Sequence, residues 1–124
     1  MRRLTLAVAI DAALIVLFAA LGRRTHDEGS AIGGTLAVAA PFLIGYAIAA
    51  AALRLDHAPF RVTRGAIVWA GGILVGLVLR GTAFDRGLAP AFVIVAIVTT
   101  AALLLGWRLV LSRFTAATAH APGG

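Results

Sequence analysis

The chain has 124 residues, of which 61% are hydrophobic and 13% charged, and its formal net charge is +6 at pH 7. Soluble domains contain about 45–50% apolar and about 25% charged residues, which excludes both a soluble globular domain and a polar disordered chain. The absence of cysteine excludes a disulfide-stapled secreted domain and thiol chemistry. The composition therefore indicates a multi-pass membrane protein.

Four apolar segments follow one another along the chain, each close to the about 20 residues that a helix needs to cross about 30 Å of hydrocarbon. They cover residues 4–22, 31–53, 62–79 and 88–111. No segment alternates apolar and polar residues as a barrel strand does, so we expect helices. Short polar connectors favour an up-down-up-down bundle. We expect an all-α transmembrane domain over residues 1–114 and a flexible tail over residues 115–124.

All eleven basic residues are arginines that flank the apolar segments, which is typical of topology signals and not of a nucleic-acid-binding face. The end with the termini and the second connector holds seven: Arg2, Arg3, Arg54, Arg61, Arg64, Arg108 and Arg113. The other end holds four: Arg23, Arg24, Arg80 and Arg86. We therefore expect both termini in the cytoplasm, with a reversed or dual orientation as the alternative. The Ala- and Gly-rich, lysine-free composition favours a bacterial plasma membrane, with the lipid bilayer and no nucleic acid as partner.

The second segment carries five residues at a strict four-residue spacing: Gly33, Ala37, Pro41, Gly45 and Ala49. Small residues at this spacing let helix backbones approach closely in a membrane. Pro41 removes a backbone hydrogen bond and is expected to kink the helix near the midplane. The third segment adds the GxxxG pair Gly72 and Gly76. The pattern predicts packing inside the bundle, and a dimer face or a hinge is the alternative interpretation.

Asp11 is the only acidic residue within an apolar run. A rise of about 1.5 Å per residue places Asp11 and Tyr46 at the same depth, about 10 Å from the cytoplasmic end. Arg108 lies in the last turn of the fourth segment and can extend to that level. An unpaired carboxylate in a membrane is costly, so we predict an intramembrane polar cluster of these three residues. A structural clasp between the first and fourth helices is the main interpretation, and a proton- or ion-coupled site is the alternative.

A second candidate site lies at the opposite end of the predicted bundle. Its members are Arg23, Arg24, His26 and Arg80. Guanidinium groups offer a planar fork of donors that suits a phosphate, a carboxylate or an anionic lipid. A solvated loop in which the arginines pair with neighbouring acidic residues is the main interpretation, and the anion site is the alternative.

Catalytic and metal-binding motifs are absent from the sequence, including GxSxG, HExxH, Walker and Rossmann patterns. The three histidines, His26, His57 and His120, lie on different connectors or on the tail, and His26 is expected on the opposite side of the membrane from the other two. We therefore expect no metal, no cofactor and no enzymatic activity.

Several motifs taken together carry a family resemblance: Asp11 in the first segment, GRRTHDEG at 22–29, PFLIG at 41–45, LR at 79–80, APAFVIVA at 89–96 and LLGWR at 104–108. They resemble a family of small bacterial, largely actinobacterial, membrane proteins catalogued as domain of unknown function 3054. The resemblance implies a four-span inner-membrane protein and brings no activity with it.

Two functions from different classes stay open at this stage. The first is a structural or accessory membrane protein that docks another span. The second is a small transporter or channel that works as a homo-oligomer, because a single bundle of this size is filled by its own side chains. A transporter should leave a charge lining a cavity, whereas a docking protein should leave Asp11 sealed against Arg108.

Overall fold

The computed structural model describes residues 2–23 and 31–119, which form helices joined by short connectors. The helices are α1 (Arg2–Arg23), α2 (Ala31–Ala52), the short 3-10 helix η1 (Leu55–His57), α3 (Val62–Gly81) and α4 (Pro90–Ala119). The four α-helices are long and apolar enough to cross a membrane, and no strand occurs among the described residues. The predicted all-α fold with four membrane-spanning helices is confirmed.

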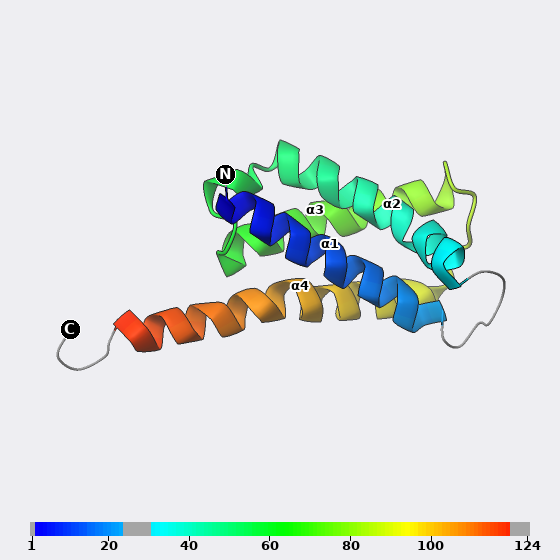
Figure 1. Cartoon of the computed structure of the whole chain (residues 1–124). Helices are drawn as coiled ribbons and strands as arrows, with labels where there is room; N and C mark the ends of the chain where they lie inside the picture. Colours follow the sequence, from blue (N-terminus) through cyan, green and yellow to red (C-terminus); the bar gives the residue numbers. More distant parts are fainter. Residues whose placement is uncertain (1, 24–30, 120–124) are drawn as a thin grey trace.

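Successive helices run in opposite directions, so the connectors alternate between the two ends of the bundle (Figure 1). The start of α1, η1 and the C-terminal half of α4 lie at one end, which we call the η1 end. The connector between α3 and α4 lies at the other, which we call the Arg80 end. The start of α1 and the end of α4 therefore lie on the same side of the bundle.

The helix limits differ from the predicted segments mainly at their ends. The third helix runs to Gly81 because the N–H of Thr82 still donates to the carbonyl of Val78, at 3.0 Å. The fourth begins at Pro90, since proline is tolerated in the first turn where its missing N–H has no partner to lose. It then continues to Ala119, so residues 115–119 of the expected tail are helical, and residues 120–124 lie outside the described part.

Helices α2 and α3 pack with their backbones in contact. A Cβ atom added to Gly45 would lie 2.6 Å from the nitrogen of Gly76 and 2.7 Å from the carbonyl oxygen of Gly72. No side chain fits there, and the absence of side chains is what allows the close approach. The three glycines thus lie in an interface within the chain.

The remaining members of the small-residue stripe lie along the same helix. Pro41 and Ala49 are buried, Ala37 is half-buried, and Gly33 is exposed near the start of α2. The helix continues through Pro41 without a break, from Ala31 to Ala52.

An aromatic cluster joins three helices towards the Arg80 end. Phe18 of α1 meets Phe42 of α2 edge to face, with ring centroids 5.8 Å apart. Phe92 of α4 lies 6.3 Å from the first ring and 6.1 Å from the second. Such edge and tilted contacts suit the ring quadrupoles and add to the burial of apolar surface.

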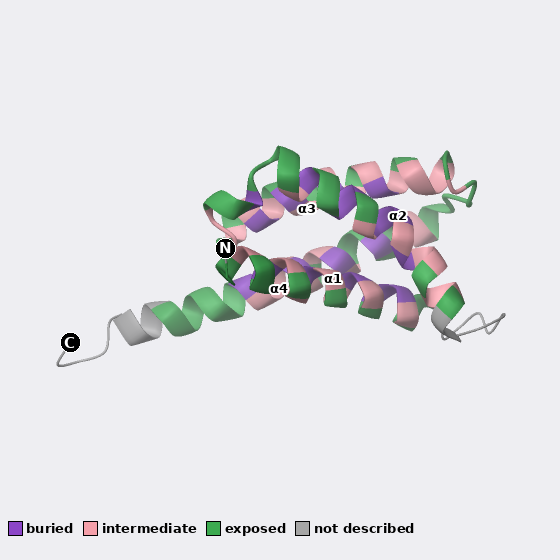
Figure 2. Cartoon of the chain, turned by 45° about the horizontal axis from the view of Figure 1, so that its top comes forward, coloured by how far each residue is buried: buried purple, intermediate pink, exposed green. Residues whose placement is uncertain are grey.

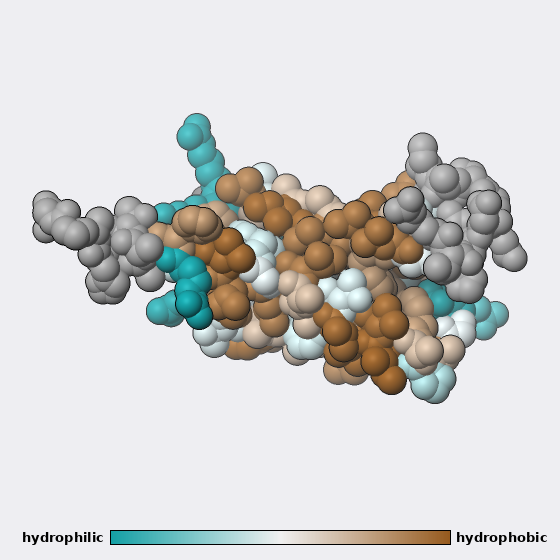
Figure 3. Space-filling model, turned by 90° about the horizontal axis from the view of Figure 1, so that it is seen from below, coloured by the Kyte–Doolittle hydropathy of each residue, from teal (hydrophilic) through white to brown (hydrophobic). Residues whose placement is uncertain are grey.

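Buried residues form stripes on the helix faces that turn towards the bundle axis (Figure 2). In α4 this stripe has a four-residue spacing: Ala96, Thr100, Leu104 and Arg108. The outward faces carry large apolar side chains, such as Ile94 at 62% and Val98 at 61% exposure. On the face seen in Figure 3, hydrophobic side chains cover most of the described surface between the two ends. An outer surface of this kind is stable when it faces lipid tails, which agrees with a multi-pass membrane protein.

Candidate functional site: a buried polar cluster

Asp11 lies on α1 inside the bundle and is 0% exposed. Arg108 donates to both of its oxygens, from Nη1 to Oδ1 at 2.9 Å and from Nη2 to Oδ2 at 2.6 Å. Trp107 donates from Nε1 to Oδ1 at 2.9 Å, and the Tyr46 hydroxyl donates to Oδ2. The carboxylate therefore accepts four hydrogen bonds, two of them in the parallel geometry that makes arginine–carboxylate pairs strong. The structure brings together all three residues of the predicted intramembrane cluster.

The Arg108 guanidinium is also held by backbone groups. It is 1% exposed, and its Nε donates to the carbonyl of Pro59 at 2.9 Å, while Nη1 donates to the carbonyl of Leu104 at 2.8 Å. A Cβ atom on Gly65 would lie 2.5 Å from Cδ of Arg108, so the glycine provides the space through which the side chain passes. The Asp11–Arg108 pair thus joins four parts of the chain: α1, α2, α4 and the α2–α3 connector.

The connector between α2 and α3 covers this cluster at the η1 end. Its Leu55 side chain is 0% exposed, and the ring of Phe60 meets Trp107 edge to face, with centroids 5.8 Å apart. Arg3 in turn lies over Phe60, with Cζ 5.8 Å from the ring centroid. This apolar cover separates the charged pair from water at the membrane surface.

The electrostatics of the cluster are balanced. One carboxylate and one guanidinium face each other in a low-dielectric interior, and each is satisfied by further hydrogen bonds, which is the condition under which a buried ion pair is tolerated. Removing one partner would leave an uncompensated charge in the membrane. The arrangement is suited to holding helices together.

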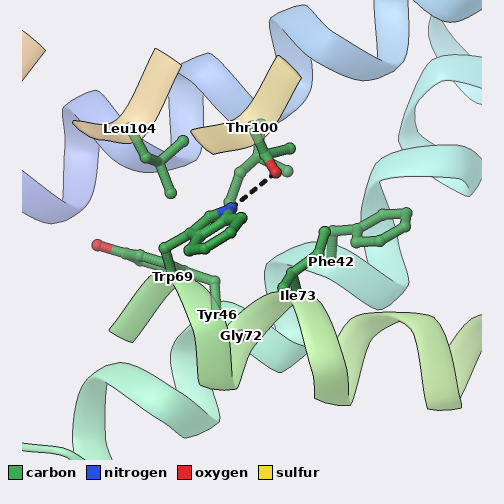
Figure 4. Close-up of a pocket in the computed structure, with 8 residues that line it drawn as sticks. Phe42, Tyr46, Trp69, Gly72, Ile73, Thr100 and Leu104 are labelled. Carbon is green, nitrogen blue, oxygen red and sulfur yellow. Dashed lines mark hydrogen bonds between the residues drawn. The ribbon is translucent and has the colours of Figure 1, made fainter. Parts of the chain in front are cut away.

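A small cavity of about 20 Å³ lies among the four helices and shares Tyr46 with this cluster (Figure 4). Its lining comes from all four helices: Ile15, Phe42, Tyr46, Trp69, Gly72, Ile73, Thr100 and Leu104. The polar groups at its wall are engaged, since Nε1 of Trp69 donates to Oγ1 of Thr100 at 2.9 Å, and that hydroxyl donates to the carbonyl of Ala96 at 2.5 Å. Neither Asp11 nor Arg108 lines the cavity, which has the volume of about one water molecule.

The second candidate site is only partly described. Arg24 and His26 lie outside the described residues, and the structure describes the backbone of Arg23 but not its side chain. Arg80 is described in full. Its Cζ lies 3.8 Å from the ring centroid of Phe92, and its Nε donates to the carbonyl of Gly87 at 2.9 Å. No ion pair joins Arg80 to an acidic residue of the described part.

Sequence reasoning missed four members of these contacts. Trp107 was not among the residues predicted for the cluster, although its position next to Arg108 was a usable signal. Nothing in the sequence predicts that the carbonyl of Pro59 and the space at Gly65 serve Arg108, because both depend on how the connector folds under α4. The hydrogen bond to Thr100 could not be predicted either, since a single threonine in an apolar helix usually bonds its own backbone.

Metal ions are usually held by several histidine, cysteine, aspartate or glutamate side chains. Within residues 2–23 and 31–119 no three such side chains lie close enough together to hold one.

Comparison with known proteins gives one match. The family model described as protein of unknown function (DUF3054) matches residues 8–111 of this chain. The matched region holds Asp11, Tyr46, Trp107 and Arg108, as well as Arg80. No curated protein and no solved structure matches the chain.

Proposed function

The chain belongs to the DUF3054 family, and from that premise we propose that it is a structural or accessory membrane protein without catalytic activity, whose Asp11–Arg108 pair clasps the bundle. The observation that carries the proposal is the environment of Asp11, which is 0% exposed and accepts four hydrogen bonds. A carboxylate with every strong acceptor position used is suited to a structural role.

A proton or ion relay would need a different environment. An intramembrane acid that carries protons has to meet water or the transported ion in at least one state. Asp11 instead lies against Arg108, Trp107 and Tyr46, and it does not border the central cavity. These contacts favour the structural role over transport through a single bundle.

The clasp also joins parts of the chain that lie far apart in the sequence. Asp11 lies in α1 and Arg108 in α4, and the direct contact between these two helices is less extensive than that between the other neighbouring helices. A buried ion pair whose disruption costs about 3–5 kcal/mol can therefore decide whether α4 stays docked.

A docked partner helix would have to use the outer surface, because Gly45, Gly72 and Gly76 are already packed inside the bundle. Helix α4 offers small residues on its outer side. Ala102 is exposed, and a Cβ on Gly106, one turn later, would meet nothing within 4 Å. Two small residues at this spacing are the kind of surface that helices in membranes use for association, whether with a second copy or with another membrane protein.

The orientation is part of the proposal. Arg108 is neutralised by Asp11, so six arginines remain as flanking charges at the η1 end: Arg2, Arg3, Arg54, Arg61, Arg64 and Arg113. The Arg80 end has four in the sequence. The positive-inside rule then favours the η1 end, with both termini, in the cytoplasm of a bacterial cell.

Reconstitution into liposomes tests the proposal. We expect proton, sodium, potassium and chloride flux into proteoliposomes to equal that of protein-free liposomes, for the wild type and for Asp11→Asn alike. Arg54→Gln is the matched control, because it breaks the exposed ion pair with Asp56 and leaves the buried one intact. Flux through the wild type that Asp11→Asn abolishes and Arg54→Gln preserves would overturn the structural role and support the homo-oligomeric transporter or channel.

A further inference from the structure

The guanidinium of Arg80 is fixed in position at the end of the bundle opposite η1. One face of the group lies on the ring of Phe92, with Cζ 3.8 Å from the centroid. Its Nε edge donates to the carbonyl of Gly87 at 2.9 Å. A guanidinium has five N–H donors arranged around a plane, so stacking and one hydrogen bond hold it without using the donors on Nη1 and Nη2.

One of these nitrogens is buried without a partner. Nη1 of Arg80 is the single buried side-chain nitrogen or oxygen of the described residues that makes no hydrogen bond. The ion pairs within residues 2–23 and 31–119 are Arg108–Asp11 and Arg54–Asp56, so no described carboxylate neutralises Arg80. A buried, unpaired donor on a charged group is destabilising, and in a native protein it indicates a ligand, an ion or a bridging water.

The height of Arg80 in the membrane narrows the choice of ligand. The span α3 runs from Val62 to Gly81, and Arg80 is its last residue but one. At about 1.5 Å per residue, Arg80 lies about 27 Å from Val62, close to the thickness of the hydrocarbon core. The guanidinium of Arg80 therefore reaches the level at which phospholipid phosphates lie.

The local charge also favours an anion. The backbone N–H of Arg86 donates to the carbonyl of Arg80 at 2.8 Å, which places a second arginine in the same turn. Helix α4 begins at Pro90, two residues before the stacking partner Phe92, so the positive end of its dipole lies at this site. Asp85 is the one acidic residue of the turn, and it is exposed and forms no ion pair with a described arginine.

We propose that the Nη1–Nη2 edge of Arg80, stacked on Phe92, binds a phosphate oxyanion at the membrane interface. The guanidinium fork matches two phosphate oxygens, and the stack removes the rotational freedom that a long side chain would otherwise lose on binding. The phosphodiester of a phospholipid and inorganic phosphate share this chemistry. The site is separate from the Asp11 cluster and does not depend on the function proposed above.

The test uses the full chain purified in detergent, with lipid retention measured by native mass spectrometry and thermal stability measured in parallel. Four probes distinguish a phospholipid from free phosphate as the ligand: phosphatidylglycerol, phosphatidylcholine, diacylglycerol without phosphate, and inorganic phosphate. Arg80→Gln removes the fork, and Arg86→Gln is the matched control that removes the same charge from the same turn.

We expect at least one phosphate-bearing probe to stabilise the wild type more than diacylglycerol does, and Arg80→Gln to weaken that binding at least about tenfold. Arg86→Gln should keep most of the binding of that probe. Retention of both phospholipids identifies any phosphodiester as the ligand, retention of phosphatidylglycerol alone identifies an anionic lipid, and stabilisation by inorganic phosphate alone identifies a soluble anion.

Equal binding by the wild type and Arg80→Gln would overturn the proposal, as would equal losses in Arg80→Gln and Arg86→Gln, which indicate general charge attraction. Should Arg80→Gln fail to fold, Arg80→Lys keeps the charge without the fork, and Phe92→Leu removes the stack. Unchanged phosphate binding in both of these variants would also overturn the proposal.

Discussion

Asp11 and Arg108 lie 97 residues apart in the sequence, yet the guanidinium meets both carboxylate oxygens, at 2.6 and 2.9 Å, with both side chains withdrawn from solvent. The pair joins the first helix to the last, and Tyr46 brings in the second. Because the surroundings are apolar, the contribution of each partner depends on the presence of the other.

A double-mutant cycle tests this coupling. We expect Asp11→Asn and Arg108→Gln each to lower the free energy of unfolding by about 3–5 kcal/mol, because each leaves one buried charge unpaired. The double variant should be less destabilised than either single variant. Unfolding in mixed micelles, followed by circular dichroism, measures the four free energies, and strictly additive effects would contradict the pairing.

Gly65 should be intolerant of a methyl group. A Cβ at this position would lie 2.5 Å from Cδ of Arg108, a side chain whose far end is held by four described hydrogen bonds and cannot easily move away. We expect Gly65→Ala to lower stability by about 1–3 kcal/mol through overpacking. The matched control is Gly106→Ala, which meets open space and should be neutral or stabilising by up to about 1 kcal/mol because alanine favours helix. Equal thermal stability of the two variants would argue against the packing described for Arg108.

The contact between α2 and α3 makes a similar prediction. Gly45→Leu would force the backbones of α2 and α3 apart at Gly72 and Gly76, so we expect loss of the compact monomer or a fall in melting temperature of many degrees. Ala47→Leu places the same side chain on the exposed face of the same helix and should leave stability nearly unchanged. Disulfide crosslinking between cysteines introduced in α2 and α3 reports the helix separation directly. Identical crosslinking in both variants would refute the glycine contact.

The Trp69–Thr100 hydrogen bond should contribute measurably to the docking of α4 on α3. Thr100→Val removes the acceptor and leaves the Trp69 N–H without a partner, so we expect a loss of about 1–3 kcal/mol. Thr100→Ser keeps the hydroxyl and should lose clearly less. Tryptophan fluorescence adds a local readout, because the indole environment should change in the valine variant only. Serine and valine variants of equal stability would show that the hydrogen bond is unimportant.

The depth of the polar cluster could be predicted from the sequence, whereas its full composition could not. A helix advances by a constant rise, so counting from the ends of the apolar runs places Asp11, Tyr46 and Arg108 at similar levels. Trp107 and Arg108 are neighbours that point about 100° apart on an ideal helix. Only the actual packing of α1 against α4 determines that both of them reach the same carboxylate.

At the other end of the bundle, the position of Arg80 could also be predicted from the sequence, whereas its contacts could not. Its place beside a predicted membrane surface follows from the end of an apolar run. Its stack on Phe92 and its unpaired Nη1 follow from the fold of the turn at 82–86, in which Asp85 adopts a φ of 49° and Arg86 bonds back to Arg80.

What the sequence by itself determined is the number of spans, their approximate limits and the all-α class, because crossing a membrane depends on the length and hydropathy of each segment separately. The tertiary structure decided which small residues pack inside the chain, which side chains satisfy Asp11 and which arginine has a buried nitrogen without a partner. Those outcomes depend on the rotation of each helix about its axis and on the distances between helices. In a chain whose helices are apolar all round, the hydrophobic pattern does not specify that rotation, and polar pairing and glycine contacts specify it instead.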